Sequence, residues 1–594
     1  MKIDIELKYF NPIIALYNGV NSMIDSKKEV IRLLETIAIY MELKGENPFK
    51  IQAFRKAANA LELDERLLIE IDNFQAIPGI GKGTAAVIDE YIETGQSEVL
   101  KQLQEEVPKG LIPLLQIPGL GGKTIAKLYN ELDVENVNDL KRVCEEGKVR
   151  ELKGFGPKKE EKILKSIEEL GMRPERLPLA SVLPIVTWIE EQLAGMNSIE
   201  KFSRAGSIRR TKETVKDIDF IIATTEPHLV KEQLLKMPNI KELTNQGDTK
   251  VSCVFSFEFD ISADFRIVTR DQFATTLHHF TGSKEHNIRM RQLAKERHEK
   301  ISEYGIEQIE TGEVLTFSTE TDFYHHFQLP FISPELRDDG SEIERIDELN
   351  NLVTLTDIRG DLHMHTTWSD GAHSLEEMVE ACRLRGYEYM AITDHSQFLK
   401  VANGLTEDRL RRQMDRIHQL NEKYSDFTIF TGIEMDILPD ATLDFHDDLL
   451  KEVDFVIASI HSAFGQSKEM IMKRLRTACE NPYVNIIAHP TGRKIGKREG
   501  YSVQIDELIQ LAKDTNTILE LNASPRRLDL RKEHLVKAQE AGVKIMINTD
   551  SHHRDTLSNM EIGVNYARSA WLKKDTVMNT KSLKELQLIL NKTS

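Results

Sequence analysis

The sequence predicts a multidomain protein of mixed α/β and α+β architecture, and three observations support this fold class. The chain has 594 residues, which is more than one hydrophobic core usually organises. Its first part repeats a G-x-G motif before amphipathic helices, its middle part contains short alternating strands, and its last part alternates apolar strands with helices. Hydrophobic residues make up 40% of the chain and charged residues 29%, as in ordinary globular proteins.

The composition also bounds the compartment. The four cysteines lie far apart without a C-x-x-C pair, so we expect a reducing compartment and neither a disulfide framework nor a thiolate zinc site. No apolar run approaches the roughly 18 residues of a membrane span, and we expect no membrane partner. Residues 1–22 lack the features of a signal peptide, and we expect them to be an extension that takes no part in the fold.

The N-terminal region contains three similar segments, Ile77–Gly95, Ile117–Leu132 and Leu152–Leu170, each with an apolar residue, G-x-G and an amphipathic helix. Glycine permits tight turns, and the free N–H groups of a helix start can bind an anion. This is the pattern of the helix-hairpin-helix, although a plain connection between helices is the alternative for any single copy. It predicts DNA binding through main-chain amides, despite a net charge of −18, at Gly79, Gly81, Gly119, Gly121, Gly154 and Gly156.

The middle region predicts a site for nucleotidyl transfer. Asp217 and Asp219 are two apart on a predicted strand, so both carboxylates face the same way. Asp264 lies on a later strand and is preferred over Asp260 as the third carboxylate, because "DFRIV" alternates like a core strand. Three convergent carboxylates suit two Mg²⁺ ions that hold a triphosphate and the attacking hydroxyl. The preceding loop offers contacts to that triphosphate through Gly206, Ser207 and Arg210.

The motifs "GSIRR", "DIDF", "DFRIV" and "FTGSKEHN" together resemble the family X DNA polymerases, the family of DNA polymerase beta. The resemblance runs from about Met23 to Leu336 and implies a nucleotidyltransferase palm and a thumb, with Asp264 activating the primer 3′-hydroxyl. The segment 279–291 resembles the family's nucleotide pocket. It implies that Phe280 and Gly282 pack against the sugar, that Asn287 bonds the incoming base and that Arg291 touches the template strand.

The sequence departs from that family at three positions. His279 stands where the family usually has tyrosine, and Lys216 stands where a glycine commonly precedes the first aspartate. Val87 stands where members with deoxyribose-phosphate lyase activity carry the lysine that forms the Schiff base. Valine has no amine to form an imine, so we expect weak or absent lyase activity by that route.

The C-terminal region predicts a metal site. His363 and His365 are two apart on an entering strand, and later apolar strands each end in a potential ligand. The carboxyl ends of the strands of a β/α barrel meet on one face. Nine imidazole and carboxylate groups without a thiolate suit three ions of Mn²⁺ or Zn²⁺, and such ions favour phosphoester hydrolysis. The nine residues are His363, His365, Asp370, His395, Glu434, His461, His489, Asp550 and His552.

The motifs "DLHMHTTWSDG", "TDH", "GIE", "IAHP" and "DSH" resemble the PHP (polymerase and histidinol phosphatase) domain, and "AHPTGR" adds Arg493 as either a phosphate contact or a plain surface arginine. We therefore expect this organisation: an extension (1–22), a small N-terminal domain with the first hairpin (23–100), a fingers-like hairpin region (101–176), a palm (177–270), a thumb (271–335), an acidic linker (336–357) and a PHP barrel (358–594).

The resemblances together imply a bacterial cytoplasmic DNA polymerase that fills gaps in DNA repair, including base excision repair, with a PHP 3′–5′ exonuclease. Gapped or primer-template DNA and dNTPs would be its partners, and we expect a monomer. Three alternatives stay open: a small-molecule phosphatase fused to a degenerate polymerase, a non-enzymatic DNA scaffold, and a template-independent nucleotidyltransferase. Extension of gapped DNA with and without template separates them.

Overall fold

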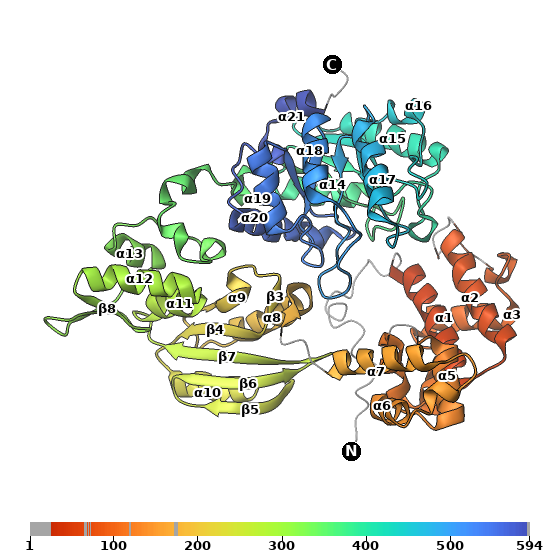
Figure 1. The fold of residues 1–594 in the computed structure, drawn as a ribbon, viewed down its shortest axis with the longest axis horizontal. Helices are drawn as coiled ribbons and strands as arrows, with labels where there is room; N and C mark the ends of the chain where they lie inside the picture. The colour runs from red at the N-terminus through yellow and green to blue at the C-terminus, as the bar shows by residue number, and fades with distance from the viewer. Residues whose placement is uncertain are drawn as a thin grey trace. The chain divides into compact units, whose positions relative to one another are not determined.

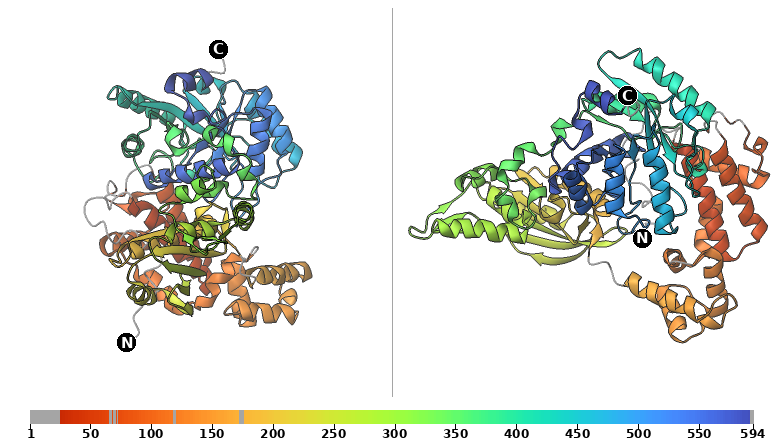
Figure 2. Two further views of the ribbon diagram at one scale, coloured as in Figure 1. Left: turned by 90° about the vertical axis from the view of Figure 1, so that its left-hand side faces the viewer. Right: turned by 45° about the horizontal axis from the view of Figure 1, so that its top comes forward.

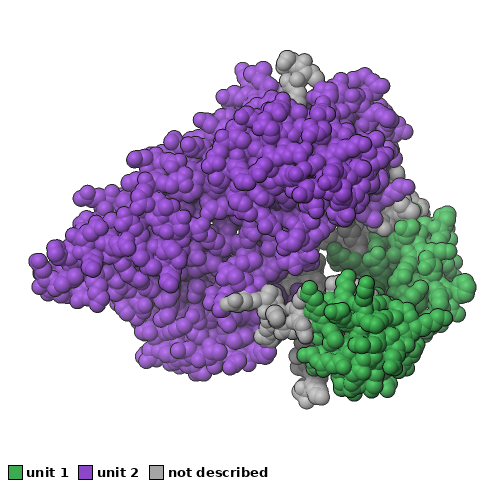
Figure 3. All heavy atoms as spheres, in the orientation of Figure 1, with its two compact units in different colours: residues 1–173 green, residues 174–594 purple. Residues whose placement is uncertain are grey.

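The computed structural model describes residues 25–64, 68, 71, 73–117, 120–171 and 176–590. The predicted extension 1–22 lies outside the described residues. The chain divides into two compact units, Met1–Arg173 and Pro174–Ser594 (Figure 3). Among the described residues, no helix is both long and apolar enough to cross a bilayer.

The first unit is entirely helical where it is described. Two apolar clusters organise it, one around Ile37 and Ile88 and one around Leu43 and Ile125. The predicted segments each form a short turn followed by a helix, namely α3, α5 and α7. The helices are α1 (Asp25–Lys44), α2 (Pro48–Leu63), α3 (Lys82–Thr94), α4 (Glu98–Glu106), α5 (Gly122–Leu132), α6 (Val137–Glu145) and α7 (Pro157–Gly171).

The second unit begins with a five-stranded sheet in the order β2-β4-β7-β6-β5, visible at the lower left of Figure 1. Phe220, Phe255 and Phe265 pack with Trp188 of α8 in its core. A two-residue pair, β1 (Leu177–Pro178) and β3 (Thr214–Val215), lies beside it. The other elements are α8 (Leu179–Ala194), β2 (Lys201–Arg204), α9 (Gly206–Arg209), β4 (Asp217–Ala223), α10 (Pro227–Leu235), β5 (Ile240–Gln246), β6 (Lys250–Ser256) and β7 (Asp260–Val268).

A smaller set of helices and strands follows the sheet, and the predicted linker 336–357 is folded onto it. Short 3₁₀ helices span Pro334–Leu336, Ser341–Ile343, Ile346–Asn351 and Leu355–Asp357. Arg337 is fully buried in this stretch and donates to Glu320 of α13, so the segment is held in place rather than extended. The elements before it are α11 (Phe273–Thr281), α12 (Lys284–Glu296), β8 (Glu299–Ile301), β9 (Ile306–Gln308), β10 (Val314–Leu315) and α13 (Glu320–His326).

The C-terminal part is a seven-stranded parallel sheet whose strands neighbour one another in chain order, β11 to β17. A parallel bridge between Met364 and Ser551 brings its first and last strands together, so the sheet is a nearly closed barrel. The strands are β11 (Gly360–Asp361), β12 (Tyr389–Ile392), β13 (Thr428–Asp436), β14 (Phe455–Ser459), β15 (Ile486–Ile487), β16 (Ile518–Asn522) and β17 (Ile545–Asn548).

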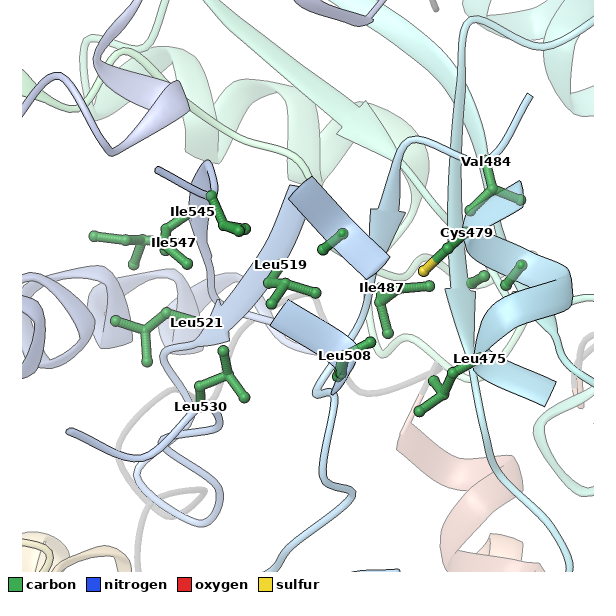
Figure 4. Packing of buried hydrophobic residues seen from close by; sticks show 14 of the residues in the cluster. Leu475, Cys479, Val484, Ile487, Leu508, Leu519, Leu521, Leu530, Ile545 and Ile547 are labelled. Carbon is green, nitrogen blue, oxygen red and sulfur yellow. The ribbon is translucent and has the colours of Figure 1, made fainter. Parts of the chain in front are cut away.

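Helices surround this barrel, as Figures 1 and 2 show. Leucine, isoleucine and valine side chains from the strands pack against the helices; Figure 4 shows Leu519, Leu521 and Ile545 among them. This packing fixes the strand ends, from which the chemistry projects. The helices are α14 (Leu375–Leu384), α15 (Glu407–Asn421), α16 (Asp447–Leu450), α17 (Lys468–Glu480), α18 (Ile505–Asp514), α19 (Lys532–Ala541), α20 (Asn559–Ser569) and α21 (Leu583–Leu590).

Candidate active sites

The palm aspartates come from two neighbouring parallel strands. Asp219 of β4 lies opposite Asp264 of β7 in the strand register, and Asp217 lies two residues earlier on the same face. Asp260, the alternative third carboxylate, lies at the other end of β7 and bonds Ser256. The geometry therefore groups Asp217, Asp219 and Asp264, as the sequence pattern predicts.

The mutual repulsion and the burial of the three palm aspartates favour the binding of cations between them. Burial, followed by the negative charges of Asp217 and Asp264, raises the pKa of Asp219 to about 7. One basic neighbour, Lys250 of β6, places its Nζ 2.6 Å from Asp264 Oδ2, a contact that the sequence analysis did not find. Bound divalent cations would offset both the burial and the repulsion that raise the pKa of Asp219.

Gly206 allows the phosphate-binding loop to lie directly against the carboxylates. Its φ is +60°, and a Cβ on this residue would lie only 2.3 Å from Asp219 Oδ2. Both the backbone conformation and the space therefore require glycine here. The first turn of the short helix α9 consequently begins beside the carboxylate pair.

A pocket of about 460 Å³ adjoins these aspartates. Arg210 donates to the Thr281 carbonyl, and a Cβ on Gly282 would lie 3.1 Å from the Arg210 guanidinium. Phe280 is covered by the guanidinium of Arg266 at 4.5 Å, and Asn287 donates to the His279 carbonyl over 2.8 Å. The predicted nucleotide and template residues all line this pocket, together with Lys216 and His279: Gly206, Ser207, Arg210, Phe280, Gly282, Asn287 and Arg291.

The nine predicted barrel residues converge at the carboxyl ends of the strands. Eight of them form three groups whose ligand atoms lie within 4.8 Å of one another: His365 with Asp370, His395 and His552; His363 with His365 and Asp550; and His395 with Glu434 and His461. The ninth, His489, places Nε2 3.1 Å from Glu434 Oε1. Shared members link the groups, as in a cluster of several cations with bridging ligands.

The donor atoms of this cluster fit metal ions. Within the described part of the chain, buried nitrogens of His363, His365 and His395 and an oxygen of Glu434 have no hydrogen-bond partner. Burial opposes a charged imidazole, but Glu434 and then Asp436 raise the pKa of His461 to about 10. The carboxylates next to His461 therefore favour a positive charge on its ring. Bound metal cations would supply that positive charge in place of the proton.

A second layer of side chains orients the ligands, and the sequence analysis missed it. Glu520 of β16 is fully buried, lies 2.7 Å from His363 Nδ1, and accepts the His489 backbone N–H over 2.7 Å. Asp436 lies 3.3 Å from His461 Nδ1. Glu520 and Asp436 both lie on barrel strands next to ligand-bearing loops, which is the only sequence signal for them.

Arg493 does not face the metal cluster as a free phosphate contact would. It is buried and donates to Glu213, which lies in the loop before β3 of the palm, over 2.7 Å. The phosphate-contact prediction for Arg493 is therefore replaced by an ion pair between palm and barrel.

The hairpin glycines of the first unit have two different structural roles. Gly79 and Gly154 have φ values of +109° and +91°, which explains why glycine is needed at those turns. Gly81, Gly121 and Gly156 have no such φ, and a Cβ there would meet no atom of the described residues within 4 Å beyond its chain neighbours. Gly119 lies outside the described residues. The role in DNA binding predicted for these glycines therefore stays a prediction.

The palm with its carboxylates and pocket, the seven-stranded barrel with its imidazole cluster, and the hairpins define a class: DNA polymerases that join a polymerase beta-like core to a PHP domain. Family models agree with this class in four parts of the chain. They are a helix-hairpin-helix domain (25–97), a SAM-like helix-hairpin-helix tandem (111–169), the DNA polymerase beta thumb (276–338) and the PHP domain (361–524).

The DNA polymerase/3′-5′ exonuclease PolX of Bacillus subtilis (strain 168) is 59% identical over 566 residues, which cover 95% of this chain and 99% of that protein. The chain therefore belongs to the PolX family of bacterial DNA polymerases. Probable phosphatases of Thermoanaerobacter sp. (strain X514) and Clostridium acetobutylicum are 29% and 27% identical over 37% and 39% of this chain, and 89% and 93% of their own lengths.

Proposed function

We propose that this protein is a DNA-directed DNA polymerase that fills gaps during DNA repair, and that its PHP domain is a 3′–5′ exonuclease. One observation carries the polymerase assignment: three carboxylates lie together on adjacent strands, and two of them, Asp217 and Asp219, line a pocket whose other residues suit a nucleotide. The PolX relative, whose name includes both activities, supports the pair of assignments.

In the palm, Asp217, Asp219 and Asp264 would hold Mg²⁺, which neutralises a triphosphate and lowers the pKa of a hydroxyl when bound. Asp264 would accept the proton of the primer 3′-hydroxyl, while the Lys250 ammonium 2.6 Å away fixes the orientation of its carboxylate. Ser207 and Arg210 would bind the triphosphate oxygens of a dNTP, because both line the pocket beside Asp217 and Asp219.

Specificity for the sugar and base would come from the rest of the pocket. The tight backbone at Gly282, together with Phe280, would leave no room for a 2′-hydroxyl. Asn287 lines the pocket, where it would bond the minor-groove edge of an incoming base, and its Oδ1, buried without a hydrogen-bond partner among the described residues, could accept there only from the amino group of guanine. Arg291 lies at the same pocket, where it would contact the template strand.

In the barrel, the nine ligands would hold three ions of Mn²⁺ or Zn²⁺, and such ions supply Lewis-acid stabilisation and an activated water for phosphoester hydrolysis. Glu520 would hold the His363 ring in one orientation and one tautomer. Deoxyribose-phosphate lyase activity is not part of the proposal, because Val87 lies buried in the apolar core of the first unit.

The decisive experiment uses 5′-labelled single-nucleotide-gapped DNA with dNTPs and Mg²⁺ or Mn²⁺. Asp217→Ala with Asp219→Ala should abolish extension and leave degradation of the 3′ end intact. His363→Ala with His365→Ala should do the opposite. Extension that proceeds equally without a template strand would contradict the roles given to Asn287 and Arg291. Light scattering of the free protein tests the expected monomer.

A further inference from the structure

Four basic side chains gather at the carboxyl end of the barrel, beside the candidate metal cluster. Lys494 and Arg498 lie on the loop that follows β15 and His489, and Arg526 and Arg527 lie on the loop that follows β16. Lys494 and Arg526 are exposed, whereas Arg498 and Arg527 are half-buried. The established features of the site assign no role to any of the four.

Backbone hydrogen bonds hold the two loops together. The Ile495 N–H donates to the Arg526 carbonyl over 2.8 Å, and Lys494 and Arg498 exchange two backbone hydrogen bonds of 2.8 Å. Arg527 Nε lies 3.6 Å from Oδ2 of Asp550, one of the nine candidate ligands. The four cations therefore form a built group that begins at the ligand cluster and extends outward from it.

Three of the four basic side chains in this group have no carboxylate partner among the described residues. Among the described residues, Lys494, Arg498 and Arg526 form no ion pair with a carboxylate; Arg498 bonds the Gly492 carbonyl over 2.7 Å and lies over the Phe464 ring at 4.0 Å. Although the chain carries a net charge of −18, such a group attracts an anion locally.

The palm holds one of the two loops. Arg493, which precedes Lys494, donates to Glu213 over 2.7 Å, and Glu213 also accepts from the Tyr566 hydroxyl of α20. A Cβ on Gly496 would lie 2.5 Å from Pro178 Cγ of β1, so the loop touches the palm where only glycine fits. The basic loop thus depends on the domain that carries the polymerase site.

We propose that Lys494, Arg498, Arg526 and Arg527 bind the backbone phosphates of the DNA chain whose 3′ end lies in the metal cluster. In this arrangement the palm, through Glu213 and Arg493, positions the loop that carries Lys494 and Arg498. The proposal rests on the exonuclease function given above and specifies its substrate as a polynucleotide rather than a small phosphoester, since several neighbouring cations can bind more than one phosphate.

The test compares two substrates of the full-length enzyme in Mn²⁺: a single-stranded DNA oligonucleotide and bis(p-nitrophenyl) phosphate. Lys494→Gln with Arg526→Gln should lower the ratio of kcat/KM for the oligonucleotide to that for the small diester by about tenfold or more. The slope of log kcat/KM against log salt should also become shallower by about 1 to 1.5 for the oligonucleotide. Lys497→Gln, an exposed lysine on the same loop, is the matched control.

The outcomes separate the two hypotheses. If the wild-type protein degrades no DNA, the proposed exonuclease function fails. If it degrades DNA but the double variant matches Lys497→Gln in ratio and salt slope, only the phosphate-site proposal is overturned. An equal loss on both substrates also overturns it, because damage to the metal cluster then explains the effect.

The role of the palm is tested separately with Glu213→Gln. We expect the same substrate ratio to fall by about threefold to tenfold, since the ion pair that fixes the loop is broken. Glu499→Gln is the matched control, because Glu499 also pairs with an arginine of this region, Arg531, over 2.9 Å but its side chain is 94% exposed. A ratio equal for Glu213→Gln and Glu499→Gln would overturn the positioning role.

Discussion

At the scale of single residues, the palm site depends on a position without a side chain. Gly206 has a φ of +60°, and a Cβ added to it would lie 2.3 Å from Asp219 Oδ2. We predict that Gly206→Ala lowers polymerase kcat/KM by about 100-fold or more, because the methyl group must displace a carboxylate that orients the reaction. Primer extension on gapped DNA measures this.

Strain alone must be separated from that displacement, and Gly312 provides the comparison. Its φ of +71° matches that of Gly206, but a Cβ there would meet no atom within 4 Å. Gly312→Ala should therefore cost only the backbone strain, about 1–2 kcal/mol of unfolding free energy, and leave extension within twofold. Equal losses of activity in the two variants would show that the contact with Asp219 is unimportant.

The barrel offers a second residue-scale prediction at Glu520. Its carboxylate lies within hydrogen-bond distance of four nitrogen atoms: His363 Nδ1, the His489 backbone N, Asn522 Nδ2 and Asn548 Nδ2. A glutamine there has one acceptor oxygen in place of two, so Glu520→Gln should lower exonuclease activity and affinity for Mn²⁺ by about 10- to 100-fold. Metal titration and exonuclease assays measure both; polymerase activity, which serves as the internal control, should not change.

The sequence could predict those functional residues whose place on a strand is visible in the sequence, either at the end of an apolar run or two positions apart. Most of the nine barrel ligands lie near the end of an apolar strand or just after it, and Asp217 and Asp219 are two residues apart on one strand and so face the same way. Glu520 and Lys250 carry no such signal: each is one polar residue inside a strand, and its role depends on which strand lies beside it. Arg493 shows that a sequence signal can also mislead. Its position close to His489 suggested a role at the metal site, but its partner is Glu213, 280 positions away.

At the scale of elements, a buried ion cluster joins three parts that are far apart in the chain. Glu320 of α13 accepts from Arg337 over 2.9 Å, and Arg209, in the phosphate-binding loop of the palm, donates to it over 3.2 Å. Because Arg337 lies in the stretch that composition marked as a linker, this cluster explains why that stretch is folded. Acidic composition alone could not show that one buried arginine would fix the segment.

We predict that Glu320→Gln lowers the unfolding free energy of the polymerase region by about 3 kcal/mol, because two arginines lose their buried carboxylate. Extension should also weaken, since Arg209 follows Gly206 and Ser207 in the same helix. Denaturant unfolding and primer extension measure the two effects. Glu232→Gln removes an exposed carboxylate 4.0 Å from Lys236 and should change the unfolding free energy by less than about 0.5 kcal/mol; a similar change in both variants would contradict the prediction.

At the scale of the whole molecule, a protein of net charge −18 must bind a polyanion through local sites. We predict that the hairpins meet this requirement with main-chain N–H groups at helix starts, which need no basic side chain. Gly121 lies at the N-cap of α5, is exposed, and has a φ of −96°, which any residue adopts. Beyond its chain neighbours, a Cβ there would meet no atom of the described residues within 4 Å, so packing among those residues does not require glycine at this position.

Gly121→Glu should therefore weaken binding to gapped DNA about tenfold, since its carboxylate would occupy the space of a phosphate, while the melting temperature stays within about 1 °C. Fluorescence anisotropy at fixed salt measures the affinity. Asn138→Glu makes the same charge change at an exposed position of α6 and should alter binding less than twofold. Gly121→Ala should fall between the two, because a methyl group crowds the phosphate without repelling it. Equal effects of Gly121→Glu and Asn138→Glu would mean that net charge, and not the hairpin, governs DNA affinity.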